Sequence, residues 1–482
     1  MKITIKNIGI FEHVEYELGD LNIICGGNNT GKTYATYALY GFLDYWKNSI
    51  RHYSPLIYAP ISQKLITQLM ETGSISIPLV CDQITIDEIM NKICNVYSQQ
   101  VLPKIFATKQ EYFKDSLFLI NIPVSELKLL ETYDKKWQSS TGNELFQIVK
   151  ESGKKEIVVT MLVNQNKVND QDIQNNTLNT VENIIKSFIN IAYAKIMFSH
   201  TIPDVFIASA ERTGAVIFKD ELNLDKNALL KQVTQNEEIN PNTIVNSLYT
   251  PTYALPVRRN IEVVRNLSTI AKNESFISKD YPWILTKFDD LIGGAYKIDK
   301  DGGIYYAPKI NRVVKKLTMG ESSSSVRALL DVGFYLRHLA EKDDLLMIDE
   351  PELNLHPENQ RRITRLFAIL ANIGVKIFIT THSDYIIKEL NTLIMLFSTK
   401  DKNHATKIMH DYGYLEQELI NPKKIRVYIS QKASVMLPGK TKKARTQVLH
   451  SAPIDDFYGV EASSFDKAIN EMNKIQNLLV FG

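Results

Sequence analysis

Hydrophobic and polar positions along the chain repeat with two different periods. Short apolar or alternating runs, which are typical of β-strands, lie at 2–6, 21–25, 156–163, 204–209, 345–348 and 376–380. Apolar positions repeat with the helical period over 33–47, 84–106, 178–197, 258–272, 322–341, 358–373 and 383–391. The run GGAYKIDKDGGIYY predicts a hairpin that turns at Asp301, Gly302 and Gly303. The pattern therefore predicts a mixed α/β protein.

Composition narrows the class of protein. The 482 residues are 44% hydrophobic and 23% charged, which is ordinary for a globular chain with room for two or three domains. The three cysteines are too scattered for a disulfide framework, which fits a reducing compartment. The N-terminus lacks the apolar run of a signal peptide, and no run approaches a membrane span. We therefore expect a cytoplasmic protein without a membrane partner.

One segment combines an apolar strand, a glycine-containing loop and a helix. Its loop fits G-x-x-x-x-G-K-[ST] with Gly26, Gly27, Asn28, Asn29, Thr30, Gly31, Lys32 and Thr33. In such a loop the backbone amides turn inward toward phosphate oxygens, and the start of the helix adds partial positive charge. Lys32 is expected to reach the β and γ phosphates, and the Thr33 hydroxyl to bind Mg²⁺. The loop predicts a site for ATP with magnesium.

A second segment, LLMIDEPELNLHP at 345–357, places two acids at the end of an apolar strand. The carboxyl ends of parallel strands form the edge of the sheet where ligands bind. We expect Asp349 to hold Mg²⁺ through water, and Glu350 to orient and deprotonate the attacking water.

Four motifs occur together in a fixed order: GGNNTGKT, LTMGE at 317–321, IDEPELNLHP, and ITTHSD at 379–384. In order and approximate spacing they resemble the ABC-type ATPases, in the branch that includes the SMC proteins, RecF and the OLD-type (overcoming lysogenization defect) ATPases of bacteria. The resemblance covers about residues 1–50 and 310–395. It implies an α/β fold: an ABC-type P-loop head with a mixed sheet and a largely helical insertion.

The resemblance also implies roles for single residues. Thr318, Gly320 and Glu321 fall in the signature usually written L-S-G-G-Q/E, which touches the nucleotide held by a second subunit; Met319 departs from that pattern. A simpler reading makes Thr318 or Ser322 a helix N-cap. His382 resembles the switch histidine that contacts the γ phosphate. Lys32, Glu350 and His382 would then be the catalytic residues of an ATP-sandwiched homodimer or higher oligomer.

Spacing separates the branches of this family. Lys32 and Gly320 are 288 residues apart, about three times the interval of transporter subunits. The intervening residues show no sustained heptad repeat, which excludes a long coiled coil. A compact helical insertion resembles the OLD-like ATPases of anti-phage defence. In VFIASAERTGA, Arg212 either contacts the nucleotide or braces the lobe.

The resemblance divides the chain into four parts. We expect the N-terminal half of the head at 1–60, a mainly helical insertion with some strands at 61–300, the C-terminal half of the head at 301–400, and a basic closing segment at 401–482. No D-x-D motif of a Toprim nuclease follows His382. We therefore expect a defence ATPase that controls a separate effector, either a nuclease or a toxin.

The charge of the chain is nearly balanced, with 56 Lys+Arg against 54 Asp+Glu, but residues 421–445 hold eight cations and no acid. This segment either binds nucleic acid or an acidic protein, or is a solvated surface loop. Binding of DNA there would favour the alternative function, a RecF-like ATPase of DNA repair or chromosome maintenance.

Overall fold

The computed structural model describes residues 1–50, 61–138, 144–162, 178–218, 253–299, 302–309, 315–461, 471, 472 and 474–478. The chain divides into two compact units. The smaller consists of Met1–Ile3, Phe42–Val101 and Phe118–Asp204, and the larger of Thr4–Gly41, Leu102–Leu117 and Val205–Gly482. Asp301 of the predicted hairpin turn lies outside the described residues.

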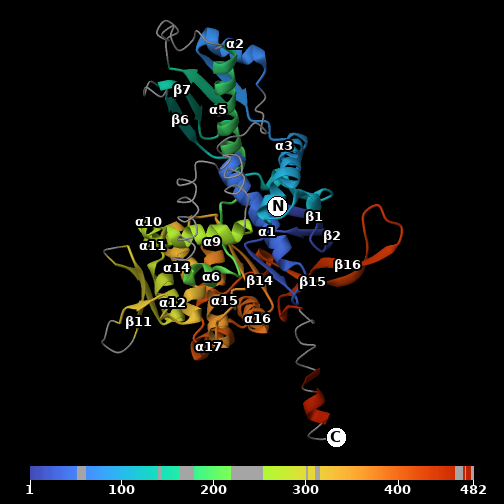
Figure 1. Ribbon diagram of the computed structural model, residues 1–482, viewed down its shortest axis with the longest axis vertical. Helices are drawn as coiled ribbons and strands as arrows, with labels where there is room; N and C mark the ends of the chain where they lie inside the picture. The colour runs from blue at the N-terminus through green and yellow to red at the C-terminus, as the bar shows by residue number, and fades with distance from the viewer. Residues whose placement is uncertain are drawn as a thin grey trace, which may run out of the picture. The chain divides into compact units, whose positions relative to one another are not determined.

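A six-stranded sheet forms the centre of the larger unit, with the order β16-β15-β3-β14-β13-β9 (Figure 1). Its strands are β3 (Leu21–Cys25), β9 (Val205–Ala208), β13 (Leu345–Asp349), β14 (Lys376–Thr381), β15 (Ile425–Met436) and β16 (Lys443–Ser451). All neighbours are parallel except β15 and β16, which are antiparallel. The sheet is therefore mixed, and the carboxyl ends of its parallel strands share one edge.

Burial explains why the central strands are mostly apolar. Every residue of β3 and of β13 is buried. A strand covered on both faces reads as a continuous hydrophobic run, because neither face meets water. α15 (Pro357–Asn372) packs against β14 and β3, and α16 (Asp384–Ser398) packs against α15.

The larger unit contains further helices and small sheets. Its other helices are α4 (Leu102–Ile105), α6 (Arg212–Ile217), α9 (Leu255–Arg265), α10 (Leu267–Ile270), α11 (Phe276–Asp280), α12 (Pro282–Ile292), α13 (Ser324–Ala328), α14 (Leu330–Phe334) and α17 (Lys402–Tyr412). The small strands are β1 (Lys2–Ile8), β2 (Phe11–Glu17), β10 (Gly294–Ile298), β11 (Ile304–Pro308), β12 (Leu317–Thr318), β17 (Ile454–Asp455) and β18 (Gly459–Val460). β10 and β11 form the predicted hairpin, with Ile298 opposite Ile304. α1 (Lys32–Tyr45) begins in the larger unit, at the end of the phosphate loop.

The smaller unit is built on an antiparallel sheet of four strands in the order β4-β8-β7-β6. Its elements are α2 (Gln63–Thr72), β4 (Ser74–Pro78), α3 (Gln83–Val96), β5 (Leu117–Asn121), β6 (Tyr133–Gln138), β7 (Glu144–Lys150), β8 (Glu156–Met161) and α5 (Leu178–Phe198). The Phe188 ring of α5 lies 5.2 Å from Trp137 of β6 and 5.6 Å from Phe146 of β7, measured between ring centroids. α5 therefore packs on one face of this sheet.

The predicted fold class, an α/β P-loop head with a mixed sheet, is confirmed. Each predicted strand range holds a strand, and each predicted helical range holds helical residues. The sequence left open whether segment 421–445 is a solvated surface loop. The structure shows instead that much of it is the strand β15, which pairs with β3 in the central sheet.

Candidate nucleotide-binding site

The phosphate loop connects β3 to α1 at the edge where the parallel strands end. Gly26 has φ 149° and Gly31 has φ 93°, conformations that favour glycine. A Cβ on Gly26 would lie 2.6 Å from the Ser430 carbonyl oxygen, and one on Gly31 would lie 2.7 Å from the Phe11 ring. Both glycines are required by these close approaches as well as by backbone angle. The loop is therefore packed tightly between β15 and β2.

Lys32, the first residue of α1, lies over the loop. Its side chain is buried, and its ammonium donates to the carbonyl oxygens of Gly26, at 2.9 Å, and Gly27, at 2.8 Å. Thr33 is exposed, and Thr30 donates its hydroxyl to the Gly27 carbonyl. The cation and the start of α1 thus lie together at the loop, an arrangement suited to anionic phosphate.

The two acids of the second motif occupy the end of β13. Asp349 is buried, and the Thr380 hydroxyl of β14 donates to its Oδ1. Burial is the main cause that raises the pKa of Asp349 to about 6, so the carboxyl is mostly ionised at pH 7. Glu350 has φ 52°, and its amide donates to the Thr380 hydroxyl at 3.1 Å. The backbone of Glu350 is therefore held in a conformation that non-glycine residues seldom adopt.

His382 follows β14 and lies beside Glu350, with 3.6 Å between His382 Nδ1 and Glu350 Oε1. A third acid, Glu352, anchors the turn that carries this histidine. Its Oε1 accepts from the His382 amide at 2.8 Å and from the Thr381 hydroxyl at 2.9 Å. Burial raises the pKa of Glu352. Glu352 thus fixes the backbone of the histidine and leaves its ring half-exposed.

Arg212 braces the backbone of this site. The side chain is buried and makes four hydrogen bonds to carbonyl oxygens: Nε to Ala328 at 2.7 Å, one terminal nitrogen to Ser209 and Asp349, both at 2.8 Å, and the other to Glu350 at 3.0 Å. These bonds use every nitrogen of the guanidinium. Of the two roles that the sequence leaves open, the geometry therefore supports the brace.

A cavity of about 740 Å³ brings the predicted residues together. Its lining consists of Ile10, Tyr34, Glu350, His382 and the loop residues Asn28, Asn29, Thr30, Gly31, Lys32 and Thr33. The order of strands explains this meeting, because β14, which carries His382, lies between β3 and β13. The phosphate loop, the acid and the histidine therefore face one space.

The signature residues lie elsewhere on the surface. Thr318, Gly320 and Glu321 are exposed and are not among the residues that line the cavity. The Thr318 amide donates to Glu321 Oε2 at 2.8 Å, and the Glu321 amide donates to the Thr318 hydroxyl at 3.3 Å. This is the reciprocal pattern of a capping box, although the N-cap of α13 is Ser323. One chain alone does not bring the signature into its own cavity.

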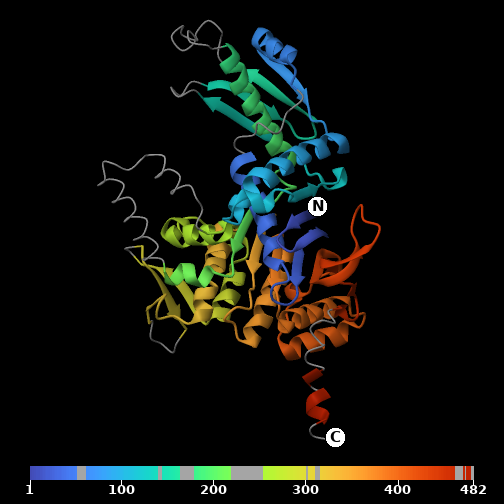
Figure 2. The ribbon, with the colours of Figure 1, turned by 45° about the vertical axis from the view of Figure 1, so that its right-hand side comes forward.

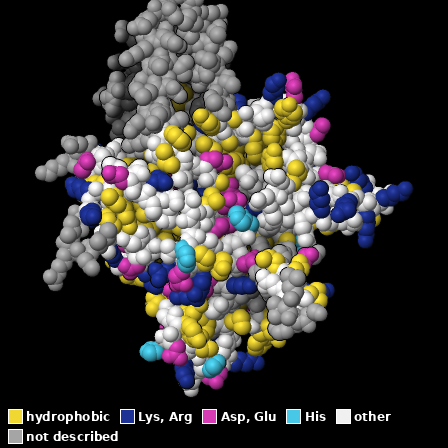
Figure 3. Space-filling view, turned by 60° about the horizontal axis from the view of Figure 1, so that its bottom comes forward, with side chains coloured by type: hydrophobic (Ala, Val, Ile, Leu, Met, Phe, Trp, Pro, Cys, Tyr) yellow, Lys and Arg dark blue, Asp and Glu magenta, His cyan; other side chains and the backbone are white. Residues whose placement is uncertain are grey.

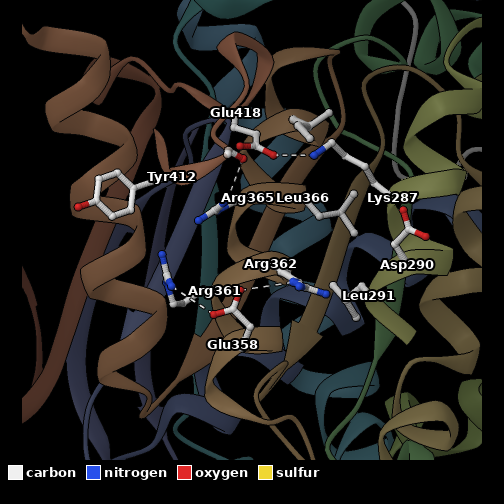
Figure 4. A pocket seen from close by; sticks show the side chains of 12 residues that line it. Lys287, Asp290, Leu291, Glu358, Arg361, Arg362, Arg365, Leu366, Tyr412 and Glu418 are labelled. Carbon is white, nitrogen blue, oxygen red and sulfur yellow. Dashed lines mark hydrogen bonds and ion pairs between the residues drawn. The ribbon is translucent and has the colours of Figure 1, made fainter. Parts of the chain in front are cut away.

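A second cavity, of about 460 Å³, lies between α12, α15 and α17 (Figure 4). Its cations point toward acids: Lys287 contacts Glu418 at 2.8 Å, and Arg362 contacts Glu358 at 3.5 Å. Arg361 and Arg365 share the buried Glu389, at 2.7 and 2.6 Å. These charges satisfy one another, so the crevice is an ion-pair network within the larger unit.

Sequence reasoning missed three residues that support the site: Thr380, Glu352 and Ser430. Thr380 and Glu352 lie inside quoted motifs, but their roles depend on contacts across strands. Ser430 Oγ donates to the Thr30 carbonyl at 2.6 Å, and this contact joins residues 400 positions apart. The strand-like run Ile425-Arg426-Val427-Tyr428-Ile429 was the available signal for β15.

This combination of fold and site defines a class, the P-loop ATPases. A family model described as an AAA ATPase domain matches residues 1–387. The chain belongs to this family and is a nucleotide-binding ATPase. A comparison with curated proteins gives no match.

Several solved structures are similar to the chain, each at 10% sequence identity. An SMC head bound to the C-terminal winged-helix domain of ScpA covers 92% of this chain and 97% of its own, with a TM-score of 0.31. An SMC head with an extended coiled coil, bound to the C-terminal domain of ScpA and derived from Pyrococcus furiosus, covers 98% of each chain, with a TM-score of 0.31. The SMC head domain from Thermotoga maritima covers 94% and 98%, with a TM-score of 0.28. In the described part of this chain, no helix has the length and hydrophobicity to cross a membrane.

Proposed function

We propose that this ATPase is a nucleotide-operated switch that closes as a homodimer or higher oligomer around ATP. One observation carries the proposal: the phosphate loop, Glu350 and His382 line one cavity, whereas Thr318 and Gly320 lie exposed outside it. A second copy that supplies the signature would complete the site. Binding of ATP would then favour the closed dimer, and hydrolysis would release it.

Within this site, Glu350 is the proposed base that orients and deprotonates water, Lys32 binds the phosphates, and His382 contacts the γ phosphate. Thr33 and Asp349 are the proposed holders of Mg²⁺. The fit is chemical: the Thr33 hydroxyl and the Asp349 carboxylate both offer oxygen, the ligand atom that Mg²⁺ prefers. Mg²⁺ normally takes only one or two protein oxygens beside phosphate and water, and when bound it neutralises phosphate charge.

The biological setting we propose is bacterial anti-phage defence, with the switch controlling a separate nuclease or toxin. The OLD-like order of motifs and the spacing of 288 residues between Lys32 and Gly320 support this setting. A compact unit with a four-stranded sheet occupies much of that interval.

Glu350→Gln tests the switch, because the amide keeps the size of the side chain but cannot accept a proton from water. We expect ATP binding to persist, turnover to fall about 100- to 10,000-fold, and dimers to accumulate with ATP. Calorimetry, phosphate release and light scattering after gel filtration measure the three quantities. Glu416→Gln removes an exposed carboxylate outside the cavity and serves as the matched control.

Turnover near the level of the unchanged protein would disprove the role of Glu350, and a monomer with bound ATP would disprove the switch. The effector is tested separately by co-purification with the products of neighbouring genes, with and without ATP. Recovery of a nuclease or toxin supports the defence role. Recovery of replication or recombination proteins supports the alternative, a RecF-like ATPase that binds DNA.

One observation favours that alternative. Six of the eight cations of residues 421–445 lie on β15, on β16 or in the turn between them, and Figure 3 shows Lys and Arg side chains crowded on the projection at its right-hand side, where this hairpin lies. An acidic protein is the other partner that such a surface could bind.

A further inference from the structure

The hairpin of β15 and β16 extends past the strand beside it. β15 pairs with β3 only through Ile425–Ile429, whereas its pairing with β16 continues from Tyr428 to Met436. Beyond Ile429, β15 therefore has β16 as its paired neighbour, and the two strands form a ribbon that ends in the turn at 437–442. Figures 1 and 2 both show this end projecting from the larger unit.

The register of the ribbon gathers positive charge on one face. Lys432 stands opposite Gln447, Ser434 opposite Arg445, and Met436 opposite Lys443. Residues opposite one another share a face, and alternate residues along a strand return to it. Lys432, Lys443 and Arg445 therefore lie on one face, while the other face carries Ala433, Val435, Ala444 and Thr446.

Most of this charge is free to act on a partner. Lys432, Lys442, Lys443 and Arg445 are exposed, and no ion pair is recorded for them among the described residues. Lys440, in the turn, pairs with Glu12 of β2 at 3.2 Å, and both side chains are about half-exposed. A pair so exposed contributes little and does not cancel the field of the ribbon.

The same face of the ribbon contacts the phosphate loop at its base. Ser430, two residues before Lys432, donates its hydroxyl to the Thr30 carbonyl at 2.6 Å. Gln447, opposite Lys432, donates to the Ser430 hydroxyl at 3.2 Å. The Ser430 carbonyl oxygen also lies only 2.6 Å from the position that a Cβ on Gly26 would take. Two hydrogen bonds, from Gln447 to Ser430 and from Ser430 to Thr30, therefore connect the basic face to the nucleotide site.

We propose that this ribbon lies in the major groove of duplex DNA, with its cations on the flanking phosphates, and passes its occupancy to the phosphate loop through Gln447 and Ser430. The inference rests on the proposed ATP switch and gives that switch an input. The major groove of B-form DNA admits a two-stranded β-ribbon, whereas the major groove of A-form RNA is too deep and narrow for side chains to read. The two-stranded form of the ribbon and its positive charge together favour duplex DNA.

Binding is measured by fluorescence anisotropy with a labelled DNA duplex, at salt concentrations from 50 to 200 mM. If the four free cations each neutralise one phosphate, the logarithm of affinity falls with the logarithm of salt at a slope of about −3.6, a loss of about 100-fold over this range. Changing Lys432, Lys442, Lys443 and Arg445 to Gln should remove most of that slope. The control changes four exposed lysines elsewhere in the larger unit: Lys272, Lys342, Lys400 and Lys407.

An unchanged slope in the ribbon variant would overturn the proposal, and so would tighter binding of duplex RNA or of a polyglutamate chain than of duplex DNA. Basal ATP hydrolysis should be the same in the ribbon variant and the unchanged protein. This separates the two proposals: loss of hydrolysis with accumulation of dimers in Glu350→Gln tests the switch, while the salt dependence of DNA binding in the ribbon variant tests its input.

Coupling is tested in the Glu350→Gln background, where ATP persists. Thermodynamic linkage requires that ATP change the affinity for DNA by the same factor as DNA changes the affinity for ATP. We expect a factor of about 5 or more, as is usual for coupled sites. Ser430→Ala should bring this factor close to one while DNA affinity in the absence of ATP is kept. Ser434→Ala, on the same face but away from the loop, should preserve the factor. A factor of one in the parent protein, or an undiminished factor in Ser430→Ala, would refute the coupling.

Discussion

Replacing Arg212 by lysine separates a brace for Glu350 from a contact to nucleotide. The guanidinium holds four carbonyl oxygens, including that of Glu350 at 3.0 Å. Lysine keeps the positive charge that interacts with Asp331, a buried acid of α14, but its single ammonium cannot reach all four carbonyl oxygens. The backbone of Glu350, already at φ 52°, would lose one of its anchors.

The magnitude follows from the lost bonds. Hydrogen bonds to a charged group contribute about 1.5–3 kcal/mol each, and since such losses are not additive we expect Arg212→Lys to lower the free energy of unfolding by roughly 3 kcal/mol. A displacement of the base by about 1 Å can cost about 100-fold in rate. We therefore expect kcat to fall about 10- to 100-fold, with KM for ATP nearly unchanged because the phosphate loop is intact.

The assay combines urea unfolding of the larger unit with steady-state ATP hydrolysis at a temperature where the variant is folded. Arg337→Lys is the matched control, since Arg337 pairs with Asp289 and donates to the Gly333 carbonyl, away from Glu350. It should lower stability and leave kcat unchanged. If Arg212→Lys instead raises KM while kcat is kept, Arg212 contacts the nucleotide and the brace is wrong.

Three further predictions follow, two on the phosphate loop and one on the buried acid Asp331. Lys32→Ala should abolish ATP binding measured by calorimetry, because it removes the ammonium from the phosphate site; an undiminished affinity would disprove the site. Gly26→Ala should lower both the melting temperature and ATP affinity, since its Cβ would meet the Ser430 carbonyl at 2.6 Å, whereas Gly27→Ala, whose nearest neighbour is 4.0 Å away, should do neither. Burial raises the pKa of Asp331 to about 7, so this group costs stability as pH rises toward and through that value, and Asp331→Asn should gain about 2–3 kcal/mol relative to the unchanged protein between pH 5 and pH 8 in urea unfolding. An equal pH dependence in both proteins would contradict that pKa.

The features of the fold and of the site that could be predicted from the sequence lie mostly in short local motifs. Leu21 to Thr33 encode a strand, a turn and a helix start in contiguous residues, and the structure places them as the pattern predicts. Asp349 and Glu350 end an apolar strand, and burial of that strand on both faces brings the acids to the edge of the sheet. These features depend on backbone angles and hydrophobic periodicity, which short stretches of sequence specify.

Other features were decided only by the tertiary structure. The brace by Arg212 joins carbonyl oxygens as far as 138 residues along the chain, and Ser430 reaches Thr30 over 400. From its charge alone, the basic segment could be a surface loop or a binding surface. The register between β15 and β16 is what places Lys432, Lys443 and Arg445 on one face. Such contacts depend on which strands become neighbours, and that choice is set by burial summed over the whole sheet, not by any one segment.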